Sequence, residues 1–310
     1  MEWRKSIFFL SVVCLLVHTT EAQKIILTPK WTAQAQFIGY YVAEQMGFYK
    51  EEGLDVQVKH PAVSESSFSI LQEGRSQVAV MNLSFALTAD ADLVNVMQTS
   101  QENSLMLVSR LPLENINSLQ HKKVAIWNHL SDELLDRLKR YYHLDVEWIR
   151  FNSGVNLFLS GAVDICLVGS YNEYIQLAEC GFQSDSSYIY RFSDYGYNLP
   201  EDGLYVTREF YQSHSDTVAK IVRASVRGWK WAGEHPEQAL DIIMEVVRRN
   251  NIGTNRYHQR KMLEEQLRLQ VDESTHTRTY HLSRQGFERA ANILLDDKEK
   301  SRILYEDFVK

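Results

Sequence analysis

The sequence predicts an α/β protein, because short runs rich in β-branched residues alternate with longer segments of helical periodicity. Polar residues suited to N-caps precede several of the helical segments, and glycines follow them. After residue 202 the pattern changes to one further strand and a series of long helices. These observations favour one mixed architecture over separate all-α and all-β parts.

The first 22 residues have the composition of a secretory signal peptide. Arg4 and Lys5 precede the apolar run 7–17, and Ala22 is a small residue suited to cleavage before Gln23. The run is shorter than the roughly 18 apolar residues that a membrane-spanning helix needs, and no later run reaches that length. We therefore expect an exported, soluble mature chain of about 288 residues, long enough for two lobes.

Strands and helices are expected in a regular order along the mature chain. The predicted strands span 24–27, 55–59, 78–81, 105–108, 123–126, 146–150, 165–168 and 204–207. The predicted helices span 64–72, 132–142, 154–161, 215–234, 236–250, 255–269 and 283–295. Ser64 and Ser131 are the expected N-caps, and Gly74 and Gly161 are the expected stops.

The segment 31–56 predicts a pocket for a small planar molecule. Gln34 and Gln36 follow Trp31 in a loop, and a helix with Tyr40 near its first turn comes next. Aromatic faces supply stacking and apolar burial, while a few amides and hydroxyls fix orientation. Other aromatic and apolar residues here have helical spacing and are interpreted as a core face: Phe37, Tyr41, Met46 and Phe48.

Charge and cysteine content exclude some functions. The formal net charge is -7, and no basic cluster is present that would follow a phosphate backbone, so nucleic acid is not an expected partner. Cys166 and Cys180 follow the signal peptide. Cys166 lies in an apolar strand-like run, which favours two buried thiols over one disulfide.

Motifs along nearly the whole mature chain carry a family resemblance. They are Trp31, Gly39-Tyr40-Tyr41, 47–54 (GFYKEEGL), 71–74 (LQEG), 118–124 (SLQHKKV), 151–154 (FNSG), 161–164 (GAVD), 200–206 (PEDGLYV), 224–229 (ASVRGW) and 235–240 (HPEQAL). This set resembles solute-binding proteins of the group that contains thiamine pyrimidine-precursor binders and fungal-type thiamine pyrimidine synthases. The group is related to sulfonate-, taurine- and nitrate-binding proteins.

The resemblance implies a two-lobed, type II periplasmic-binding-protein-like fold with a two-strand hinge and a central cleft. Lobe one would comprise residues 23–108 plus 205–310, lobe two 109–204, with the hinge near 107–111 and 200–204. It also implies a periplasmic protein that hands its ligand to an ABC transporter permease. We expect a monomer without a cofactor or metal, because closing a cleft requires no second subunit.

The enzyme branch of the group serves as the alternative. Its members resemble this chain but hold pyridoxal phosphate through a lysine with a histidine four residues later, and they carry a cysteine-rich iron loop. Those positions fall on Met81 and Phe85, and the loop falls near 195–201, which includes Tyr197. These side chains supply neither an amine nor suitable metal ligands, so a binding protein is the better prediction.

The candidate ligand-binding residues lie in loops and near strand ends. They are Trp31, Gln36, Tyr40, Asn82, Ser84, Trp127, Asn128, Ser153, Gly154, Asn156, Ser170, Tyr171, Tyr197 and Glu201.

Several of these candidates have a specific expected role and a structural alternative. Trp31 would stack on the ligand from one side; Trp127 would face it from the other or cap a core. The backbone N–H groups at Ser153 would bind an oxygen or serve as an ordinary N-cap. Glu201 would accept a hydrogen bond from an exocyclic amine or occupy a turn.

The expected ligand is an aminopyrimidine related to thiamine. Flavins and sulfonates stay open, because pocket substitutions change the ligand without changing such a fold. A sensor that presents its ligand to a membrane receptor is a further alternative to uptake.

Overall fold

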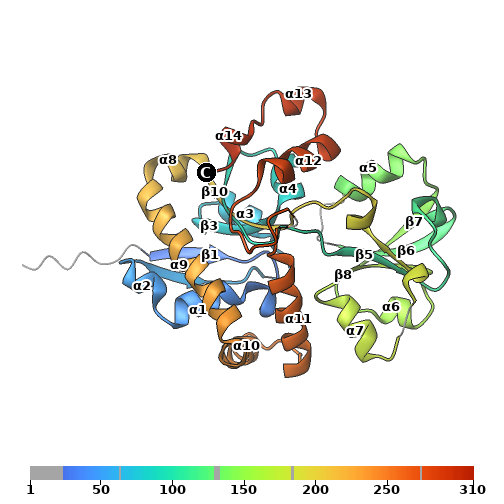
Figure 1. The fold of residues 1–310 in the computed structure, drawn as a ribbon, viewed down its shortest axis with the longest axis horizontal. Helices are drawn as coiled ribbons and strands as arrows, with labels where there is room; N and C mark the ends of the chain where they lie inside the picture. Colours follow the sequence, from blue (N-terminus) through green and yellow to red (C-terminus); the bar gives the residue numbers. More distant parts are fainter. Residues whose placement is uncertain (1–23, 63, 129–132, 183–184, 273) are drawn as a thin grey trace, which may run out of the picture.

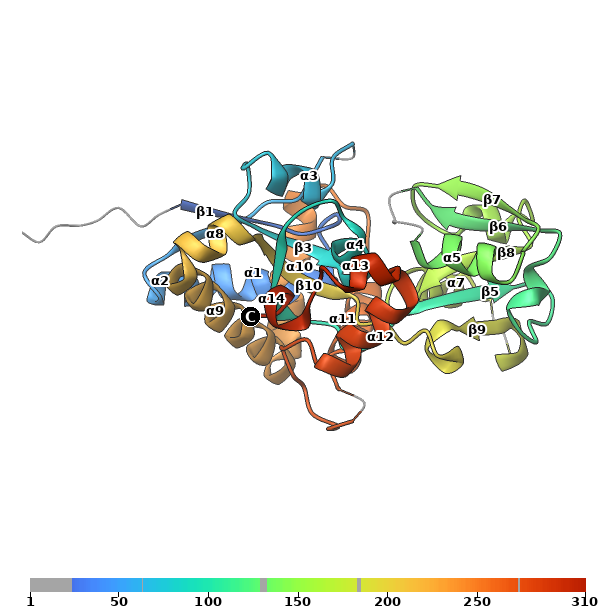
Figure 2. The same cartoon turned by 90° about the horizontal axis from the view of Figure 1, so that it is seen from above.

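The computed structural model describes residues 24–62, 64–128, 133–182, 185–272 and 274–310 (Figure 1). The predicted signal peptide, residues 1–22, and the predicted N-cap Ser131 lie outside the described residues. Two five-stranded sheets with flanking helices form two lobes, which lie side by side along the long axis of the molecule (Figure 2). The predicted two-lobed α/β class is confirmed.

The first sheet has the strand order β2-β1-β3-β10-β4. Its strands are β1 (Lys24–Thr28), β2 (Asp55–Val58), β3 (Val78–Asn82), β4 (Leu93–Gln98) and β10 (Asp202–Thr207). Strand β1 is parallel to β2 and β3, whereas β10 is antiparallel to β3 and β4. Strands β3 and β4 are almost entirely buried, which explains their continuous apolar runs.

The second sheet has the order β7-β6-β8-β5-β9. Its strands are β5 (Leu105–Ser109), β6 (Lys122–Trp127), β7 (Val146–Phe151), β8 (Ile165–Gly169) and β9 (Ile189–Arg191). Strand β6 is parallel to β7 and β8, whereas β5 is antiparallel to β8 and β9. In each sheet the antiparallel strand is therefore the first strand after the chain arrives from the other lobe.

The two crossings between the lobes define the hinge. All of β5 pairs within the second sheet, so the first crossing lies at 99–104 and not at the predicted 107–111. The apolar run of β5 had the appearance of a crossover, but its burial reflects the core of lobe two. The return crossing ends where β10 begins at Asp202, inside the predicted segment 200–204.

Lobe one carries most of the helices. These are η1 (Ala35–Phe37), α1 (Ile38–Gln45), α2 (Phe48–Glu51), α3 (Ser67–Gln72), α4 (Leu83–Thr88), α8 (Arg208–Ser213), α9 (Ser215–Glu234), α10 (Pro236–Arg249), α11 (Arg256–Leu269), α12 (Arg284–Leu294), α13 (Asp297–Lys300) and α14 (Tyr305–Phe308). The closest packing joins α1 to α9. A Cβ on Gly228 would lie 1.9 Å from the carbonyl oxygen of Gly39, and one on Gly39 would lie 2.3 Å from Trp229. Both glycines are therefore required where these helices cross.

Lobe two carries η2 (Ile116–Leu119), α5 (Glu133–Tyr141), α6 (Asn156–Leu159), α7 (Glu173–Glu179), η3 (Ser186–Tyr188) and η4 (Phe192–Tyr195). Strands β4 and β9 and helix α7 were not predicted, because their short segments lack clear punctuation. The predicted stops at Gly74 and Gly161 are confirmed, since both have a positive φ.

Three local predictions were wrong. Helix α3 is capped by Ser66 and not by Ser64, because the Ser66 hydroxyl accepts a hydrogen bond from the Ser69 N–H at 3.0 Å. Met46 is 44% exposed rather than part of the core, because α1 ends before it. Cys166 is buried as a free thiol, but Cys180 is exposed at the end of α7.

The lobes contact each other on two sides. Helix α5 of lobe two packs against α4 and α12 of lobe one, and this contact is mainly apolar. Helix α7 of lobe two packs against α11 of lobe one, and this contact is mainly polar. In the part of the chain that the structure describes, no helix has the length and apolar character needed to cross a bilayer.

The glycine crossing gives a stability prediction. Gly228→Ala should lower the free energy of unfolding by about 1–3 kcal/mol, because the new methyl group forces α1 and α9 apart. Urea unfolding followed by circular dichroism measures this. Gly253→Ala is the matched control, since a Cβ there meets nothing within 4 Å, and it should change stability by less than about 0.5 kcal/mol. Equal effects of the two substitutions would contradict the packing argument.

Candidate functional site

Polar side chains from three strand ends meet at the lobe boundary. The register pairs Asp202, the first residue of β10, with Asn82, the last residue of β3. Lys30, just beyond β1, donates a hydrogen bond to Asn82 Oδ1, and its Nζ lies 2.5 Å from Asp202 Oδ1. Gln36 Nε2 donates to the other Asp202 oxygen at 2.7 Å. One carboxylate thus orients a lysine and an amide at the same edge of the sheet.

The loop before α1 is held firmly in place. Gln34 Nε2 donates to Gln36 Oε1 at 2.6 Å, and the Gln36 side chain is buried. His60 Nδ1 lies 2.5 Å from the carbonyl oxygen of Trp31, and His60 Nε2 lies 2.7 Å from the hydroxyl of Tyr41. Burial lowers the pKa of His60, so the neutral ring donates through Nδ1 and accepts through Nε2. Trp31, half-buried, is positioned by this anchor.

Lobe two contributes residues from the carboxyl ends of β6 and β8. The Tyr171 side chain packs against the core of lobe one and lies near Gln36. Burial and the nearby Asp202, Glu201 and Glu173 raise the pKa of Tyr171 well above its ordinary value. Tyr171 is therefore a neutral hydroxyl that joins the two lobes.

Trp127 and Glu173 form a second pair in lobe two. The Glu173 carboxyl accepts the Gly169 N–H at 3.1 Å and the Asn172 side-chain N–H at 2.9 Å, and the Trp127 side chain lies near it. Burial raises the pKa of Glu173 to about 7, against the lowering effect of these hydrogen bonds. Trp127 is half-buried and packs against a core of lobe two and against a cluster shared by both lobes, so both of its sequence interpretations stay compatible with its place.

Glu201 connects the two crossings of the hinge. One carboxyl oxygen accepts the Ser104 N–H at 3.0 Å, and the other accepts the Ser104 hydroxyl at 2.7 Å. Asn103, in the same crossing, donates to Tyr197 O at 3.0 Å and to Asn198 Oδ1 at 2.8 Å. Burial raises the pKa of Glu201 to about 7, and Asp202 contributes while Lys30 opposes the shift. Glu201 is thus a hinge residue that also borders the candidate site.

One group of the predicted site residues lies at strand ends or in the adjoining segments of the two lobes. This group comprises Trp31, Gln36, Asn82, Trp127, Ser170, Tyr171 and Glu201, and within it Gln36 and Asn82 are linked through Asp202 and Lys30. Ser170 donates to Glu265 Oε1 of α11 at 2.5 Å and so contributes a contact between lobes. We define this group, with Lys30, Glu173 and Asp202, as the interlobe site.

The remaining predicted residues have other surroundings, and their role stays a prediction. Tyr40 is 1% exposed, and its hydroxyl lies 3.1 Å from Thr99 Oγ1 in the core of lobe one. Ser84 lies in α4, and Tyr197 has its hydroxyl 3.2 Å from that of Tyr142. Three further residues are exposed and one is half-buried at the edge of lobe two: Asn128, Ser153, Asn156 and Gly154.

Sequence reasoning missed Lys30, Asp202 and Glu173. Lys30 follows the strand end at Thr28, and Asp202 adjoins the predicted Glu201, so strand-end position was the available signal. Glu173 lies in the unpredicted helix α7, so nothing in the sequence pattern placed its carboxyl beside Trp127.

The positions that correspond to the enzyme branch do not fit pyridoxal phosphate. Met81 is buried within β3, and Phe85 packs edge-on against Phe68 at a centroid distance of 5.1 Å. Neither provides the amine that a Schiff base requires. Among the described residues, no group of three or more His, Cys, Asp or Glu side chains is arranged to hold a metal ion.

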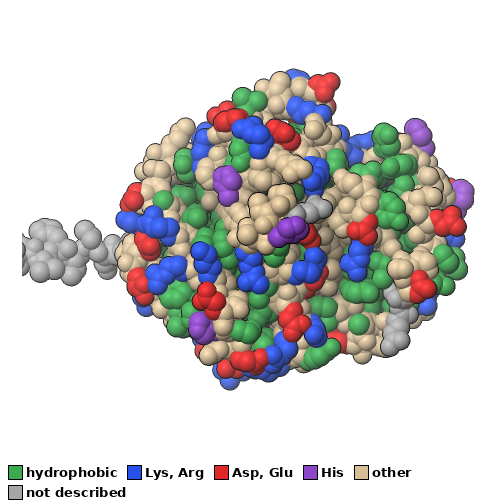
Figure 3. All heavy atoms as spheres, in the orientation of Figure 1, with side chains coloured by type: hydrophobic (Ala, Val, Ile, Leu, Met, Phe, Trp, Pro, Cys, Tyr) green, Lys and Arg blue, Asp and Glu red, His purple; other side chains and the backbone are tan. Residues whose placement is uncertain are grey.

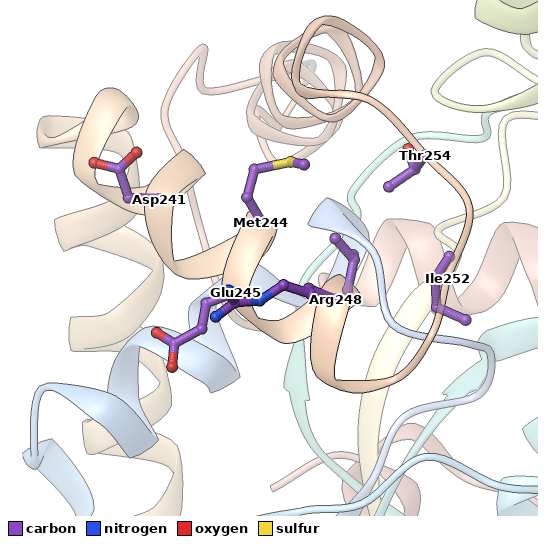
Figure 4. A pocket seen from close by; sticks show the side chains of 7 residues that line it. Asp241, Met244, Glu245, Arg248, Ile252 and Thr254 are labelled. Atoms are coloured by element: carbon purple, nitrogen blue, oxygen red, sulfur yellow. The ribbon is translucent and has the colours of Figure 1, made fainter.

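A surface hollow of about 610 Å³ lies apart from this site (Figure 4). It is formed by α10 and the loop after it, with Met244, Val247 and Ile252 as apolar lining. The hollow has no aromatic ring and belongs wholly to lobe one. The interlobe site, with aromatic and polar side chains from both lobes, is the better candidate for a small planar ligand.

Comparisons with known proteins agree with this architecture. A family model described as NMT1/THI5 like matches residues 34–239. The riboflavin-binding protein RibY of Chloroflexus aurantiacus is 22% identical over 272 residues, covering 82% of this chain and 74% of that protein. The formylaminopyrimidine-binding protein of Halalkalibacterium halodurans is 25% identical over 230 residues, covering 69% and 68%. Matches to the curated relatives span 64% to 74% of their lengths.

Solved structures show the same fold. The ligand binding component of an ABC-type import system from Staphylococcus aureus has a TM-score of 0.63 at 12% identity, covering 93% of this chain and 96% of that one. The periplasmic aliphatic sulphonate binding protein SsuA from Escherichia coli has a TM-score of 0.62 at 14% identity, covering 89% and 91%. These likenesses confirm the periplasmic-binding-protein type of fold.

The raised pKa values give a prediction on stability. Between about pH 4.5 and pH 7 the folded protein binds more protons at Glu201 and Glu173 than the unfolded chain does, so stability should fall as pH rises through this window. Glu201→Gln should flatten the fall by up to about 1.4 kcal/mol per pH unit, because the amide cannot ionise. Urea midpoints measured without ligand between pH 5 and pH 8 test this.

Glu237→Gln is the control for this measurement. The arginines at 256 and 260 hold the pKa of exposed Glu237 at about 2, so its contribution is lost only at lower pH and the slope between pH 5 and pH 8 should not change. A Glu201→Gln profile parallel to that of the wild type would contradict the assignment of Glu201.

Proposed function

The chain belongs to the NMT1/THI5-like family, and from that membership we propose that it is an extracytoplasmic solute-binding protein, not an enzyme. Its proposed role is to capture a small planar nitrogen heterocycle, first of all an aminopyrimidine related to thiamine, and to deliver it to an ABC transporter. The observation that carries this proposal is the interlobe site, where Trp31, Trp127 and Tyr171 come from two lobes that share a two-strand hinge.

Charge supports an amine-bearing ligand. Glu173, Glu201 and Asp202 are each at most 8% exposed, and Lys30 forms an ion pair with Asp202. A buried site with this excess of carboxyl groups disfavours a sulfonate or nitrate, because a second anion would lie near unneutralised charge. An amino group next to a ring nitrogen presents a donor and an acceptor side by side. A protonated carboxyl group complements that pair, and the pKa values near 7 for Glu173 and Glu201 make this form available.

The relatives support the same ligand class. One is named for riboflavin and one for formylaminopyrimidine, and both of these ligands contain a flat nitrogen heterocycle. Exposed acidic and basic side chains are interspersed over the face drawn in Figure 3, so no field of one sign is evident there. Selection would therefore arise in the buried interlobe site, not at a charged surface.

Delivery would depend on the closed arrangement of the lobes. A ligand between the lobes adds contacts that exist only when they are closed, so binding shifts the population toward that form. The transporter would then recognise the closed shape from outside the membrane. The predicted signal peptide is consistent with this location.

A ligand panel tests the proposed function. Residues 23–310 are titrated with formylated and free aminopyrimidines, thiamine, riboflavin, taurine and nitrate, while tryptophan fluorescence and melting temperature are followed together. We expect saturable binding of an aminopyrimidine at about micromolar concentration or below, and no response to taurine or nitrate. Binding of riboflavin alone would replace the ligand but keep the transport role. Binding of a sulfonate would overturn the charge argument.

A substitution at Trp31 tests the stacking role. Trp31→Ala should weaken binding of the panel ligand that responds by about 1–3 kcal/mol, the range for a base stacked on an aromatic residue. Isothermal titration calorimetry measures this difference. Trp231→Ala is the matched control, because Trp231 stacks on His235 at 4.7 Å in lobe one and is not part of the interlobe site. Unchanged affinity in Trp31→Ala would remove Trp31 from the site.

A further inference from the structure

A histidine lies buried in the polar contact between the lobes. His258 of α11 in lobe one is 6% exposed. Its Nδ1 lies 3.0 Å from Glu179 Oε2, and its Nε2 lies 3.0 Å from Asn172 Oδ1. Both partners belong to lobe two, Glu179 at the end of α7 and Asn172 immediately before it. The ring therefore makes both of its side-chain hydrogen bonds across the lobe boundary.

The orientation of the Asn172 amide is set by its other contacts. Asn172 Nδ2 donates to Glu173 Oε1 at 2.9 Å, and Asn172 Oδ1 accepts from Gln176 Nε2 at 3.0 Å. The amide oxygen therefore faces His258. Both ring nitrogens then face acceptors, and two N–H donors are available only in the doubly protonated imidazole.

The reversed amide also requires a proton. If Asn172 turned its NH2 group to a neutral His258, its carbonyl oxygen would face the Glu173 carboxyl. Two acceptors would then meet at 2.9 Å unless Glu173 carried a proton and donated it. In either arrangement His258, Glu173 and Glu179 together carry one proton more than a neutral histidine with two carboxylates would carry.

We propose that closure of the lobes takes up one proton in the chain Glu173–Asn172–His258–Glu179, and that His258 is a positioning residue for the interlobe site. The proposal rests on the proposed function only in that ligand binding uses the same closure. Opening the lobes separates His258 from both acceptors, and the extra proton is then released to water. Mild acidity therefore favours the closed form.

This chain of hydrogen bonds ends beside the interlobe site. The Glu173 carboxyl that receives the Asn172 amide also lies near the Trp127 side chain. A change at His258 thus reaches an aromatic residue of the interlobe site through two side chains. Ser170, adjacent in sequence to Tyr171, contacts Glu265 of the same helix α11.

Other charged groups around α11 form ion pairs that do not include His258. Helices α7 and α10 and the short η1 pack against α11, and η1 carries no titratable side chain. Besides the two glutamates of the chain, α7 presents the titratable residues Tyr174 and Cys180. On α10 and α11 the ion pairs are Glu237 with Arg256 and Arg260, Asp241 with Arg256, Glu245 with Arg249, Glu264 with Lys261, and Arg268 with Glu265 and Glu102. The carboxyl groups that face His258 are thus those of α7.

A distance measurement between the lobes tests the coupling. Spin labels are placed at Met46→Cys in lobe one and Leu159→Cys in lobe two, both exposed positions, in a Cys180→Ser background of residues 23–310. The closed-to-open ratio without any ligand should rise as pH falls from about 8 to about 5.5, by at most about tenfold per pH unit for one coupled proton. A ratio that does not change with pH would overturn the proposal.

Three variants separate the proposed chain from general effects of pH. His258→Gln and Glu179→Gln should each flatten the pH profile, whereas His235→Gln should keep it, because His235 contacts Trp231 within lobe one. A wild-type profile in His258→Gln would overturn the proposal, and Glu179→Gln decides alone if His258→Gln fails to fold. Since no ligand is used, a silent ligand panel would count against the proposed function and not against this coupling.

Discussion

The antiparallel return of β10 is the constraint on which the interlobe site depends. Strand β10 enters the first sheet between β3 and β4, so its first residue, Asp202, lies beside the last residue of β3. That register places a carboxylate where Lys30 and Gln36 both reach it. It also brings the preceding residue, Glu201, next to Ser104 of the other crossing. A shift of one residue would turn Asp202 to the opposite face and separate the hinge from the site.

Burial of several carboxyl groups explains why the site is so heavily hydrogen-bonded. A buried carboxylate is costly unless it is paired or accepts several hydrogen bonds. Asp202 receives a lysine and an amide, Glu201 receives the N–H and hydroxyl of Ser104, and Glu173 receives Gly169 and Asn172. These partners offset only part of the cost of burying the carboxylates. The pKa of Glu201 and of Glu173 is accordingly raised to about 7. The same side chains therefore hold hydrogen-bond donors and acceptors at the boundary between the lobes.

The sequence predicted the α/β class and most strands because their apolar runs and glycine stops are local signals. It failed where the signal is tertiary. The run of β5 had the appearance of a crossover, although pairing with β8 places it in lobe two. Asn82 was predicted from its strand-end position and Glu201 from the chemistry of its carboxylate, whereas the place of Glu173 depends on how α7 follows β8. Ser153 and Asn128, also predicted as ligand contacts, are exposed residues of lobe two, and their role stays a prediction.

The two contacts between the lobes have different physical consequences. Apolar packing of α5 on α4 and α12 is insensitive to pH and favours closure at all conditions. If such packing alone held the lobes, the empty and loaded proteins would have the same shape, and a ligand with equal affinity for both forms would shift nothing. The polar contact of α7 with α11 is weaker, because each of its hydrogen bonds replaces one with water. A contact whose free energy of formation is close to zero is the one that a ligand or a proton can shift. This contact lies directly beside the interlobe site.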